Sequence, residues 1–307
     1  MQNNFNYNSG MISYMQKIIQ QMQANNQIGT ARNYQSAMRR FSSFIGKSDI
    51  SFKQITPELI SRYQTHLQTN GIVPNTISFY LRILRATYNR AIDEYNLSDG
   101  HPFRHAFTGN ERTVKRAISL TEIKRIRELN LQHNNLQWAR DFFMFLFYCR
   151  GMSPIDAAFL KKSNVKNNII SYRRHKTLQQ LHINIEPPIK EIIDRYSKYS
   201  SPYLLPIIKS PVNTRKQYDS ALRNINKQLK IIGKLANLAK PLTTYVSRHS
   251  WATLAKNKNI PINVISDALG HNSILTTQIY LDTIDNTVID EANRLIINEL
   301  QNAKSIS

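Results

Sequence analysis

Arg150 is the first residue whose type and position could serve phosphate chemistry. It follows the apolar run Phe142–Cys149 and precedes Gly151. A cation at the C-terminus of a helix offsets the helix dipole, which is a structural role. A guanidinium at the end of a buried helix can also point into a cleft and bind a phosphate through two parallel hydrogen bonds. Taken alone, this segment favours the structural role.

A second group of candidate residues lies between Tyr245 and Tyr280. Tyr245 and Arg248 are three residues apart and would share one face of a helix. Gly270 can end the next helix, and His271 follows it in a tight connection. Each residue also has an ordinary interpretation, because His271 could be a polar connector and Tyr280, one of 15 tyrosines, could be core packing.

Lys176 lies between two short runs with the composition of β-strands, residues 168–172 and 181–185. The runs predict a hairpin with Lys176 near its turn. Arg173, Arg174 and His175 come just before it, and alternate residues of a strand face opposite sides. A basic strand with no catalytic role is therefore the alternative interpretation of this segment.

In order and spacing, these residues resemble the tyrosine recombinase (phage integrase) family. That family has an arginine after a buried helix, a lysine on a β-hairpin, a His-x-x-Arg motif, a Leu-Gly-His motif, and a tyrosine nine residues after that histidine. The matching features here are Arg150, Lys176, Tyr245-Val-Ser-Arg248, Leu269-Gly270-His271 and Tyr280. The resemblance covers about residues 115–300, and residues 248–280 are its most specific part.

The resemblance implies a site-specific DNA recombinase, or integrase, that cleaves and rejoins DNA through a covalent 3′-phosphotyrosine. Arg150 and Arg248 would clamp the phosphate, and His271 would donate a further hydrogen bond to it. Tyr280 would attack phosphorus, and Lys176, favoured by the family-like Lys-Thr pair, would protonate the departing 5′ oxygen. No metal, ATP or other cofactor is implied, and the enzyme would serve a mobile element.

Two departures from the family pattern affect this prediction. The first position of the His-x-x-Arg motif holds Tyr245, and a phenol with a pKa of about 10 is a poor base near neutrality. An acid expected three residues after Arg150 is replaced by Ser153, and the nearest acid is Asp156. Asp156 could orient an active-site arginine or cap the next helix.

Tyr245 adds weight to a second hypothesis, a non-catalytic DNA-binding accessory or regulatory protein with the same fold. A basic helical RNA-binding protein is a third, but it explains the charge and not the motif spacing. A type IB topoisomerase would share the chemistry.

The elements that must position these residues are mostly helical. We predict a mainly α fold with a small β-hairpin or sheet: a helical N-terminal core-binding domain and an α+β catalytic domain. The predicted organisation is a loose N-terminus at 1–10, the core-binding domain at 11–98, a basic linker at 99–117 and the catalytic domain at 118–307. Predicted helices cover about 11–24, 34–45, 57–70, 75–95, 119–129, 136–150, 188–199, 213–235, 244–257, 262–269, 274–281 and 287–301.

The charge of the chain agrees with a polyanionic partner. Lys and Arg number 41 against 20 Asp and Glu, which gives a formal net charge of +21. Phosphate contacts by such residues supply most of the non-specific affinity for double-stranded DNA. The candidate DNA-contacting residues are Arg82, Arg85, Arg104, Arg112, Lys115, Arg116, Arg173 and Arg174.

A membrane partner is disfavoured, because the longest apolar run, eight residues, is too short to span a bilayer. The first ten residues lack the pattern of a secretory signal, and the single cysteine allows no disulfide framework. We therefore expect a cytoplasmic, DNA-associated protein.

The apolar stripe on residues 287–301 could dock on a neighbouring copy. The resemblance implies a homo-oligomer, a tetramer on two DNA sites, with accessory proteins that bend the DNA.

Overall fold

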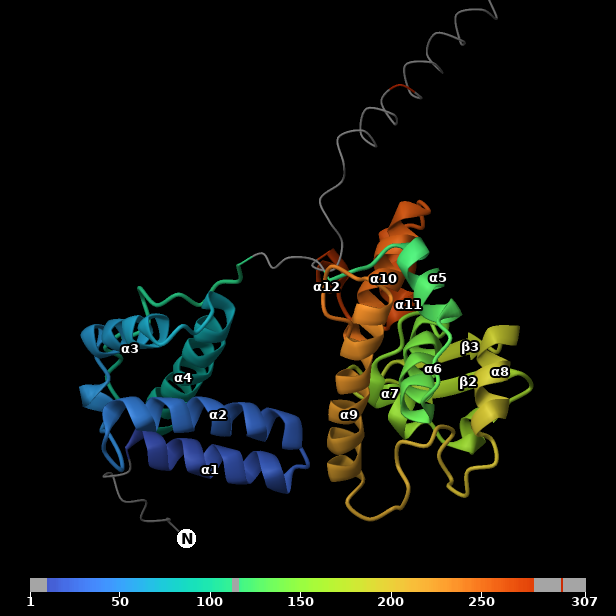
Figure 1. Cartoon of the computed structure of the whole chain (residues 1–307). Helices are drawn as coiled ribbons and strands as arrows, with labels where there is room; N and C mark the ends of the chain where they lie inside the picture. Colours follow the sequence, from blue (N-terminus) through green and yellow to red (C-terminus); the bar gives the residue numbers. More distant parts are fainter. Residues whose placement is uncertain (1–9, 112–115, 279–293, 295–307) are drawn as a thin grey trace, which may run out of the picture. The chain divides into compact units, whose positions relative to one another are not determined.

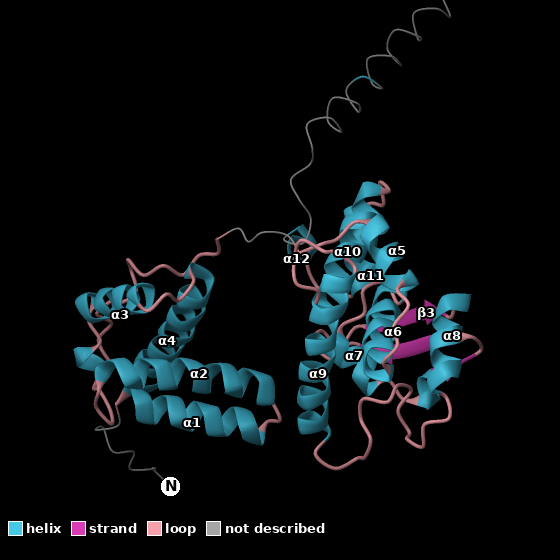
Figure 2. Ribbon diagram, in the orientation of Figure 1, coloured by secondary structure: helices cyan, strands magenta, loops and turns pink. Residues whose placement is uncertain are grey.

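The structure of the protein is a computed structural model that describes residues 10–111, 116–278 and 294. The chain divides into two compact units, with the boundary between residues 113 and 114 (Figure 1). The predicted fold class is confirmed: both units are mainly helical, and the second contains a small antiparallel sheet (Figure 2).

The first unit is built from helices α1 to α4 and a short 3-10 helix, η1. Their bounds are α1 Met11–Ala24, α2 Ile28–Ile45, η1 Phe52–Gln54, α3 Pro57–Thr69 and α4 Pro74–Tyr95. Helix α3 starts as predicted, because the hydroxyl of Thr56 accepts a hydrogen bond from the Leu59 amide and Pro57 occupies the first turn. The four predicted helices of this region are therefore confirmed, with α2 six residues longer at its N-terminus than the apolar pattern indicated.

The apolar faces of these helices form one core. Tyr63 of α3 and Phe41 of α2 are fully buried and meet edge to face, with their ring centroids 5.1 Å apart. Leu81 and Leu84 bring the apolar face of α4 to the same cluster. Because Phe41 and its neighbours turn one face of α2 inward, the polar residues of α2 occupy its outer face.

Residues 99–111 pack against the first unit, although the sequence placed them in a linker. Phe103 is buried in the core of this unit. The Ser78 hydroxyl donates to the Gly109 carbonyl at 2.5 Å, and Asn75 exchanges hydrogen bonds with the backbone of Glu111. These contacts give the segment a fixed path that its composition did not indicate.

The second unit contains helices α5 to α12 and the 3-10 helix η2. Their bounds are α5 Leu120–Glu128, α6 Asn134–Tyr148, α7 Pro154–Phe159, η2 Lys162–Asn164, α8 Pro187–Tyr196, α9 Thr214–Leu235, α10 Thr244–Asn257, α11 Ile262–Leu269 and α12 Ile274–Gln278. The predicted capping box of α5 is confirmed, with Ser119 and Glu122 bonded reciprocally. The predicted helix 287–301 lies outside the described residues, apart from residue 294.

The sheet of the second unit has the strand order β1-β2-β3. Its strands are β1 Val165–Lys166, β2 Ile169–Arg173 and β3 Gln180–Asn184. The predicted hairpin is confirmed: Ile170 pairs with Ile183 on the buried face of β2 and β3. Strand β1 was not predicted, because two residues are too few to show an alternating pattern.

Helix α6 lies at the centre of the second unit, packed against α8, α9 and α10. Its residues Phe142, Phe143, Phe145 and Leu146 are fully buried, as expected for the continuous apolar run in the C-terminal half of the helix. The chain entering this unit is tied to α10 by a hydrogen bond from the Ile118 amide to the Ser250 hydroxyl. Across the described part of the chain, no helix has the length and apolar character needed to cross a bilayer.

Candidate functional site

A left-handed turn follows α6 and carries Arg150. The helix ends at Tyr148, and both Arg150 and Gly151 have positive φ, at 58° and 67°. Gly151 also lies against α10, where an added Cβ would come within 2.9 Å of Arg248 Cα. The turn needs glycine there on both grounds. Half-buried Arg150 makes no hydrogen bond or ion pair with any residue that the structure describes.

Arg248 of α10 lies at the centre of the site and is only 2% exposed. Its Nη1 donates to the Gly151 carbonyl at 2.7 Å, and its Nη2 donates to the Leu269 carbonyl at 2.6 Å. Nη2 also lies 2.9 Å from Nε2 of His271. One guanidinium thus joins the turn after α6, the end of α11 and the turn that holds His271.

His271 is neutral in this arrangement. A guanidinium can only donate, so Nε2 of His271 accepts the bond from Arg248 and the ring proton resides on Nδ1. Nδ1 lies 2.8 Å from the hydroxyl oxygen of Thr277, which can accept a hydrogen bond from the Nδ1–H group. Burial, and after it repulsion from Arg248, Arg174 and Lys176, lowers the pKa of His271 to about 3.

The β2–β3 turn approaches the His271 turn through the carbonyl of Gly270. Arg174 Nη1 donates to this carbonyl, and the Thr177 hydroxyl donates to it at 3.1 Å. Arg174 is 6% exposed. The sequence placed Arg174 among the DNA-contacting arginines, whereas the structure directs its guanidinium into the protein, because Gly270 leaves room for it.

Asp156, near the N-terminus of α7, is the acid that lies beside this cluster. The Ser153 hydroxyl caps the helix through the Asp156 amide and donates to the Asp156 carboxylate at 2.6 Å. The carboxylate accepts the His175 amide at 2.8 Å and lies 3.9 Å from Arg174 Nε. Burial would raise the pKa of Asp156, but hydrogen bonds from His175 and Ser153 hold it below its ordinary value. Of the two roles left open by the sequence, helix capping is performed by the Ser153 hydroxyl, and the Asp156 carboxylate lies beside Arg174.

Three further predicted residues of the second unit, Lys176, Arg173 and Tyr245, are exposed. Lys176 stands on the β2–β3 turn, close enough to His271 to depress its pKa. Arg173 ends β2 with an exposed side chain. Tyr245, in the first turn of α10, is 47% exposed. Tyr280, Arg112 and Lys115 lie outside the described residues.

The structure therefore brings Arg248, His271 and Lys176 together, with Arg150 beside Gly151. Arg174, Asp156 and Thr277 join this cluster in ways that the sequence did not indicate. Several cations lie here beside the Asp156 carboxylate, which is already hydrogen-bonded within the protein. Such a cluster is suited to bind an anion such as a phosphate. Within the described ranges, no three His, Cys, Asp or Glu side chains are grouped as a metal site would require.

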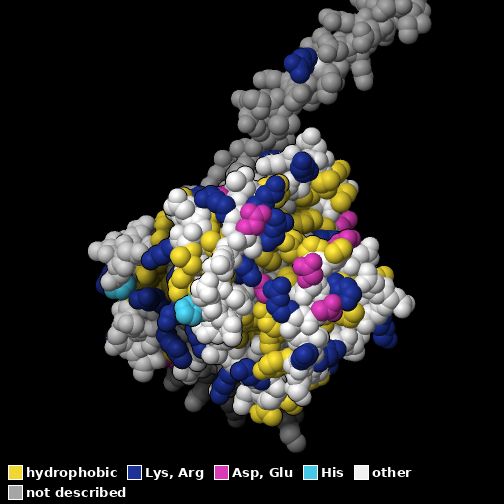
Figure 3. Space-filling view, turned by 45° about the vertical axis from the view of Figure 1, so that its right-hand side comes forward, with side chains coloured by type: hydrophobic (Ala, Val, Ile, Leu, Met, Phe, Trp, Pro, Cys, Tyr) yellow, Lys and Arg dark blue, Asp and Glu magenta, His cyan; other side chains and the backbone are white. Residues whose placement is uncertain are grey.

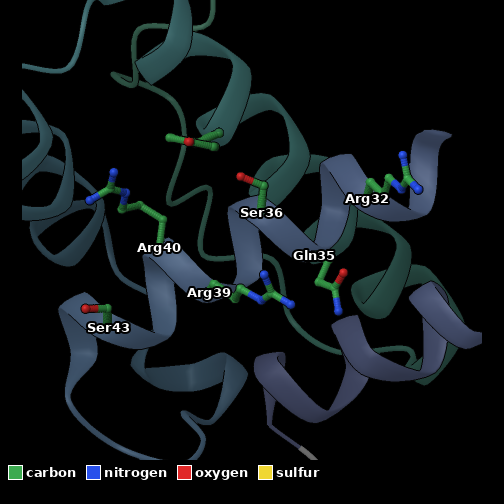
Figure 4. Close-up of a pocket in the computed structure, with 7 residues that line it drawn as sticks. Arg32, Gln35, Ser36, Arg39, Arg40 and Ser43 are labelled. Atoms are coloured by element: carbon green, nitrogen blue, oxygen red, sulfur yellow. The ribbon is translucent and has the colours of Figure 1, made fainter. Parts of the chain in front are cut away.

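The first unit presents a separate basic surface on α2. A pocket of about 460 Å³ is lined by Arg32, Gln35, Ser36, Arg39, Arg40 and Ser43 of α2 and by Tyr80 of α4. Figure 4 shows the six labelled side chains projecting from this one helix. No Asp or Glu precedes Asp49 in the chain, so α2 carries no acid to neutralise its arginines. In the sequence, Arg32, Arg39 and Arg40 form a basic stripe opposite the apolar face of this helix. This pattern could have indicated the basic surface, but these arginines were not among the predicted residues.

Other candidate DNA-contacting arginines of the first unit, Arg82, Arg85 and Arg104, are exposed, as is Arg116 at the start of the second unit. Arg85 donates to the Thr108 hydroxyl at 3.2 Å. On the face that Figure 3 shows, Lys and Arg side chains are spread widely and outnumber Asp and Glu. These exposed arginines therefore contribute to a broadly basic surface.

Two families of proteins match the chain in succession. Residues 10–107 match the phage integrase SAM-like domain, and residues 116–286 match the phage integrase family. Tyrosine recombinase XerD of Halalkalibacterium halodurans is 24% identical over 242 residues, which cover 75% of this chain and 78% of that protein. Tyrosine recombinase XerD of Staphylococcus aureus is 24% identical over 253 residues, which cover 80% and 85%.

Solved structures share the fold. A lambda integrase fragment, solved as a dimer bound to a core site, has a TM-score of 0.67 at 16% identity, covering 89% of this chain and 98% of that one. An integrase of the Tn1549 transposon, in complex with a circular intermediate DNA, has a TM-score of 0.69 at 15% identity, covering 93% and 99%.

Proposed function

The chain belongs to the phage integrase family of tyrosine recombinases, and we propose that it cleaves and rejoins DNA at specific sites through a covalent bond between Tyr280 and a 3′ phosphate. One observation carries this proposal: buried Arg248 is held beside His271 by two backbone carbonyls. A guanidinium fixed in this way can stabilise the charge that gathers on a phosphodiester in its transition state.

In the proposed reaction, the hydroxyl oxygen of Tyr280 forms a bond to phosphorus and releases its proton to solvent. The bond between phosphorus and the DNA 5′ oxygen breaks, and that oxygen takes a proton from Lys176. Arg150 and Arg248 stabilise the phosphate oxygens through charge-assisted hydrogen bonds. A 5′ hydroxyl from a second DNA end reverses these steps and releases Tyr280, so the bond energy is retained for rejoining.

His271 has to change partners for its proposed role. Its Nε2 accepts a bond from Arg248, so it cannot donate to a phosphate through that nitrogen while this bond persists. A phosphate placed beside His271 would oppose the depression of its pKa and favour a protonated ring. We therefore expect the His271 ring to take up a proton when substrate binds.

The basic surface on α2 supports double-stranded DNA as the substrate. Three arginines line one pocket of an acid-free helix, and the chain as a whole carries +21. Such a surface attracts the phosphate backbone regardless of sequence. The exposed residues Arg82, Arg85, Arg104, Arg116 and Arg173, together with Arg112 and Lys115, would add further phosphate contacts.

Service to a mobile element and assembly on two DNA sites belong to the same proposal. A transposon integrase is among the proteins of similar fold, and lambda integrase has been solved as a tetramer bound to a Holliday junction. Assembly of four copies would allow exchange between two duplexes, with DNA-bending accessory proteins as further partners.

The decisive experiment traps the covalent intermediate. DNA from the flanks of the coding element is nicked close to candidate sites, so that the short 5′-hydroxyl fragment diffuses away after cleavage and rejoining fails. Protein bound to a 3′ end after denaturation is expected for the wild type and absent for Tyr280→Phe. An adduct that persists in Tyr280→Phe would contradict the assignment of the nucleophile.

A second candidate function is a non-catalytic DNA-binding factor, favoured by Tyr245 in place of the family's histidine. Tight, sequence-specific binding with no adduct on any flank would support it. Recovery of adduct formation in Tyr245→His would then identify the cause of the missing activity.

A further inference from the structure

Lys176 lies on a turn that is fixed by its neighbours and not by Lys176 itself. The Lys176 ammonium has no hydrogen-bond or ion-pair partner among residues 10–111 and 116–278. The turn is closed by two backbone hydrogen bonds, from Arg174 to the Gln179 carbonyl and from Leu178 to the Arg174 carbonyl, each 2.9 Å long. The side chains on either side of Lys176 therefore hold the turn against the rest of the unit.

Two of these side chains bind the same atom. Arg174 Nη1 and the Thr177 hydroxyl both donate to the carbonyl oxygen of Gly270, which immediately precedes His271. The donors flank Lys176 in the sequence, two residues before it and one after it. The turn that carries the proposed proton donor is thus bound to the turn that carries a proposed phosphate ligand.

Gly270 is shaped for this contact. Its φ of 65° is left-handed, and an added Cβ would lie 2.9 Å from Arg174 Cδ and 3.0 Å from Leu181 Cδ1. A side chain at position 270 would therefore displace the Arg174 guanidinium. Arg174 is deeply buried, and its Nε faces the Asp156 carboxylate at 3.9 Å, so its charge is balanced within the protein.

The residue just before Lys176 is held as well. The Asp156 carboxylate accepts the backbone amide of His175, the residue between Arg174 and Lys176. Residues 174, 175 and 177, next to Lys176 in the sequence, are thus all bonded to other parts of the unit. A general acid must come within hydrogen-bond reach of the oxygen that it protonates, and a lysine side chain is flexible. Fixing its backbone limits where the ammonium can go.

We propose that Arg174 and Thr177 are positioning residues that fix Lys176 by binding the Gly270 carbonyl. This inference rests on the proposed function, in which Lys176 protonates the 5′ oxygen. Loss of either bond frees the turn and slows expulsion of the 5′ oxygen, while the phosphate contacts of Arg150 and Arg248 remain in place.

The test compares two leaving groups at the cleavage site mapped by the covalent adduct. One substrate has the natural 5′ oxygen, and the other has sulfur in that bridging position. A thiolate is a much weaker base than an alkoxide and departs without a proton, so the sulfur substrate bypasses the general acid. Single-turnover cleavage rates are measured for Arg174→Met, Thr177→Val and Lys176→Met.

We expect Arg174→Met and Thr177→Val to cleave the oxygen substrate about tenfold or more slowly than the wild type, and the sulfur substrate within about threefold of it. Ser171→Ala is the matched control, because it removes a hydroxyl hydrogen bond in the same hairpin, to His182 at 2.9 Å, without touching Gly270. It should cleave both substrates at wild-type rates. Thr177→Val preserves shape, so it keeps the test valid if Arg174→Met fails to fold.

Equal losses on both substrates, or no loss on either, would overturn the positioning role. The Lys176→Met variant separates this failure from that of the proposed function. If the sulfur substrate fails to restore the cleavage rate of Lys176→Met while the wild type still forms the adduct, Lys176 is not the proton donor. In that case the positioning role is also wrong, although the recombinase chemistry stands. If no adduct forms at all, the proposed function itself fails.

Discussion

The two units of the molecule hold their arginines in opposite ways. Arg248 of the second unit is almost fully buried and donates to two carbonyls and an imidazole. Arg39 and Arg40 of the first unit stand exposed on an acid-free helix. The protein thus fixes the first guanidinium before substrate arrives and leaves the orientation of the others to the ligand.

The difference teaches how one residue type serves two purposes. A buried cation has to be hydrogen-bonded, and the two carbonyls and the imidazole that accept from Arg248 are uncharged, so these bonds orient its charge without cancelling it. Such a group suits a transition state of defined geometry. Exposed arginines are screened by salt and adapt to many DNA sequences, which suits attraction to a phosphate backbone.

Arg248→Lys should give the largest effect. A single ammonium cannot reach the Gly151 and Leu269 carbonyls together and still face a phosphate. We expect adduct formation to slow by about a hundredfold or more in single-turnover assays, with DNA affinity changed only a few-fold. A rate close to that of the wild type would show that orientation by the two carbonyls has no catalytic value.

Gly151→Ala tests the tight turn that supports Arg248. A Cβ at this position would lie 2.9 Å from Arg248 Cα, and the φ of 67° is strained for alanine. We expect a loss of about 2 kcal/mol in the free energy of unfolding, measured with urea. Gly29→Ala is the control in the first unit, because its Cβ would meet nothing within 4 Å. Equal stabilities of the two variants would contradict the close packing at Gly151.

Removal of the α2 arginines should weaken DNA binding more than catalysis. The triple variant Arg32→Gln, Arg39→Gln, Arg40→Gln is expected to bind DNA about tenfold more weakly near 0.15 M salt, because fewer phosphates are neutralised. The slope of log affinity against log salt should become shallower by about one for each phosphate that the variant leaves unneutralised. Its adduct rate at saturating DNA should fall far less than that of Arg248→Lys.

The control for that variant is Arg90→Gln on α4. Arg90 lies 4.0 Å from Glu94 and bonds Gln21, so it is already engaged within the protein. Arg90→Gln should change the salt dependence of DNA binding less than the triple α2 variant does. An unchanged salt dependence in the triple variant would remove α2 from the DNA-binding surface.

The smallest effect concerns pH. The pKa of His271 is about 3 in the folded protein, below its ordinary value of 6.5, so the unfolded chain binds the proton more tightly. Stability from the neutral ring is complete above pH 6.5 and is lost as pH falls toward 3. Between pH 7 and 5.5 the wild type should lose about 1 kcal/mol more unfolding free energy than His271→Gln. Parallel pH profiles in urea titrations would contradict a buried neutral His271.

Local patterns predicted much of the fold. The apolar spacing in α4, the hydroxyl and proline at the start of α3 and the capping box of α5 all act within a few residues, and each appears as expected. Helix α7 was anticipated only as a helix near Asp156 and received no range, because six residues hold too little of a helical period to be recognised.

The site was predicted in its residues more than in its contacts. Arg248 bonds a carbonyl 97 residues away in the sequence, and Arg174 bonds one 96 residues away. Motif spacing carries no information on such distant pairings, so it could not distinguish a buried Arg174 from an exposed Arg173. The roles of Asp156 stayed open for the same reason, since two of its partners, Arg174 and His175, lie on the β2–β3 turn.

The long sequence distances between bonded groups also affect when the site can form. A chain synthesised from its N-terminus completes Gly151 long before Arg248, and Arg174 long before Gly270. Until residues 248–277 have been made, the turn after α6 lacks its bond to Arg248 and the β2–β3 hairpin lacks its bonds to Gly270. We expect a nascent or C-terminally truncated chain to bind DNA through α2 while remaining unable to cut it.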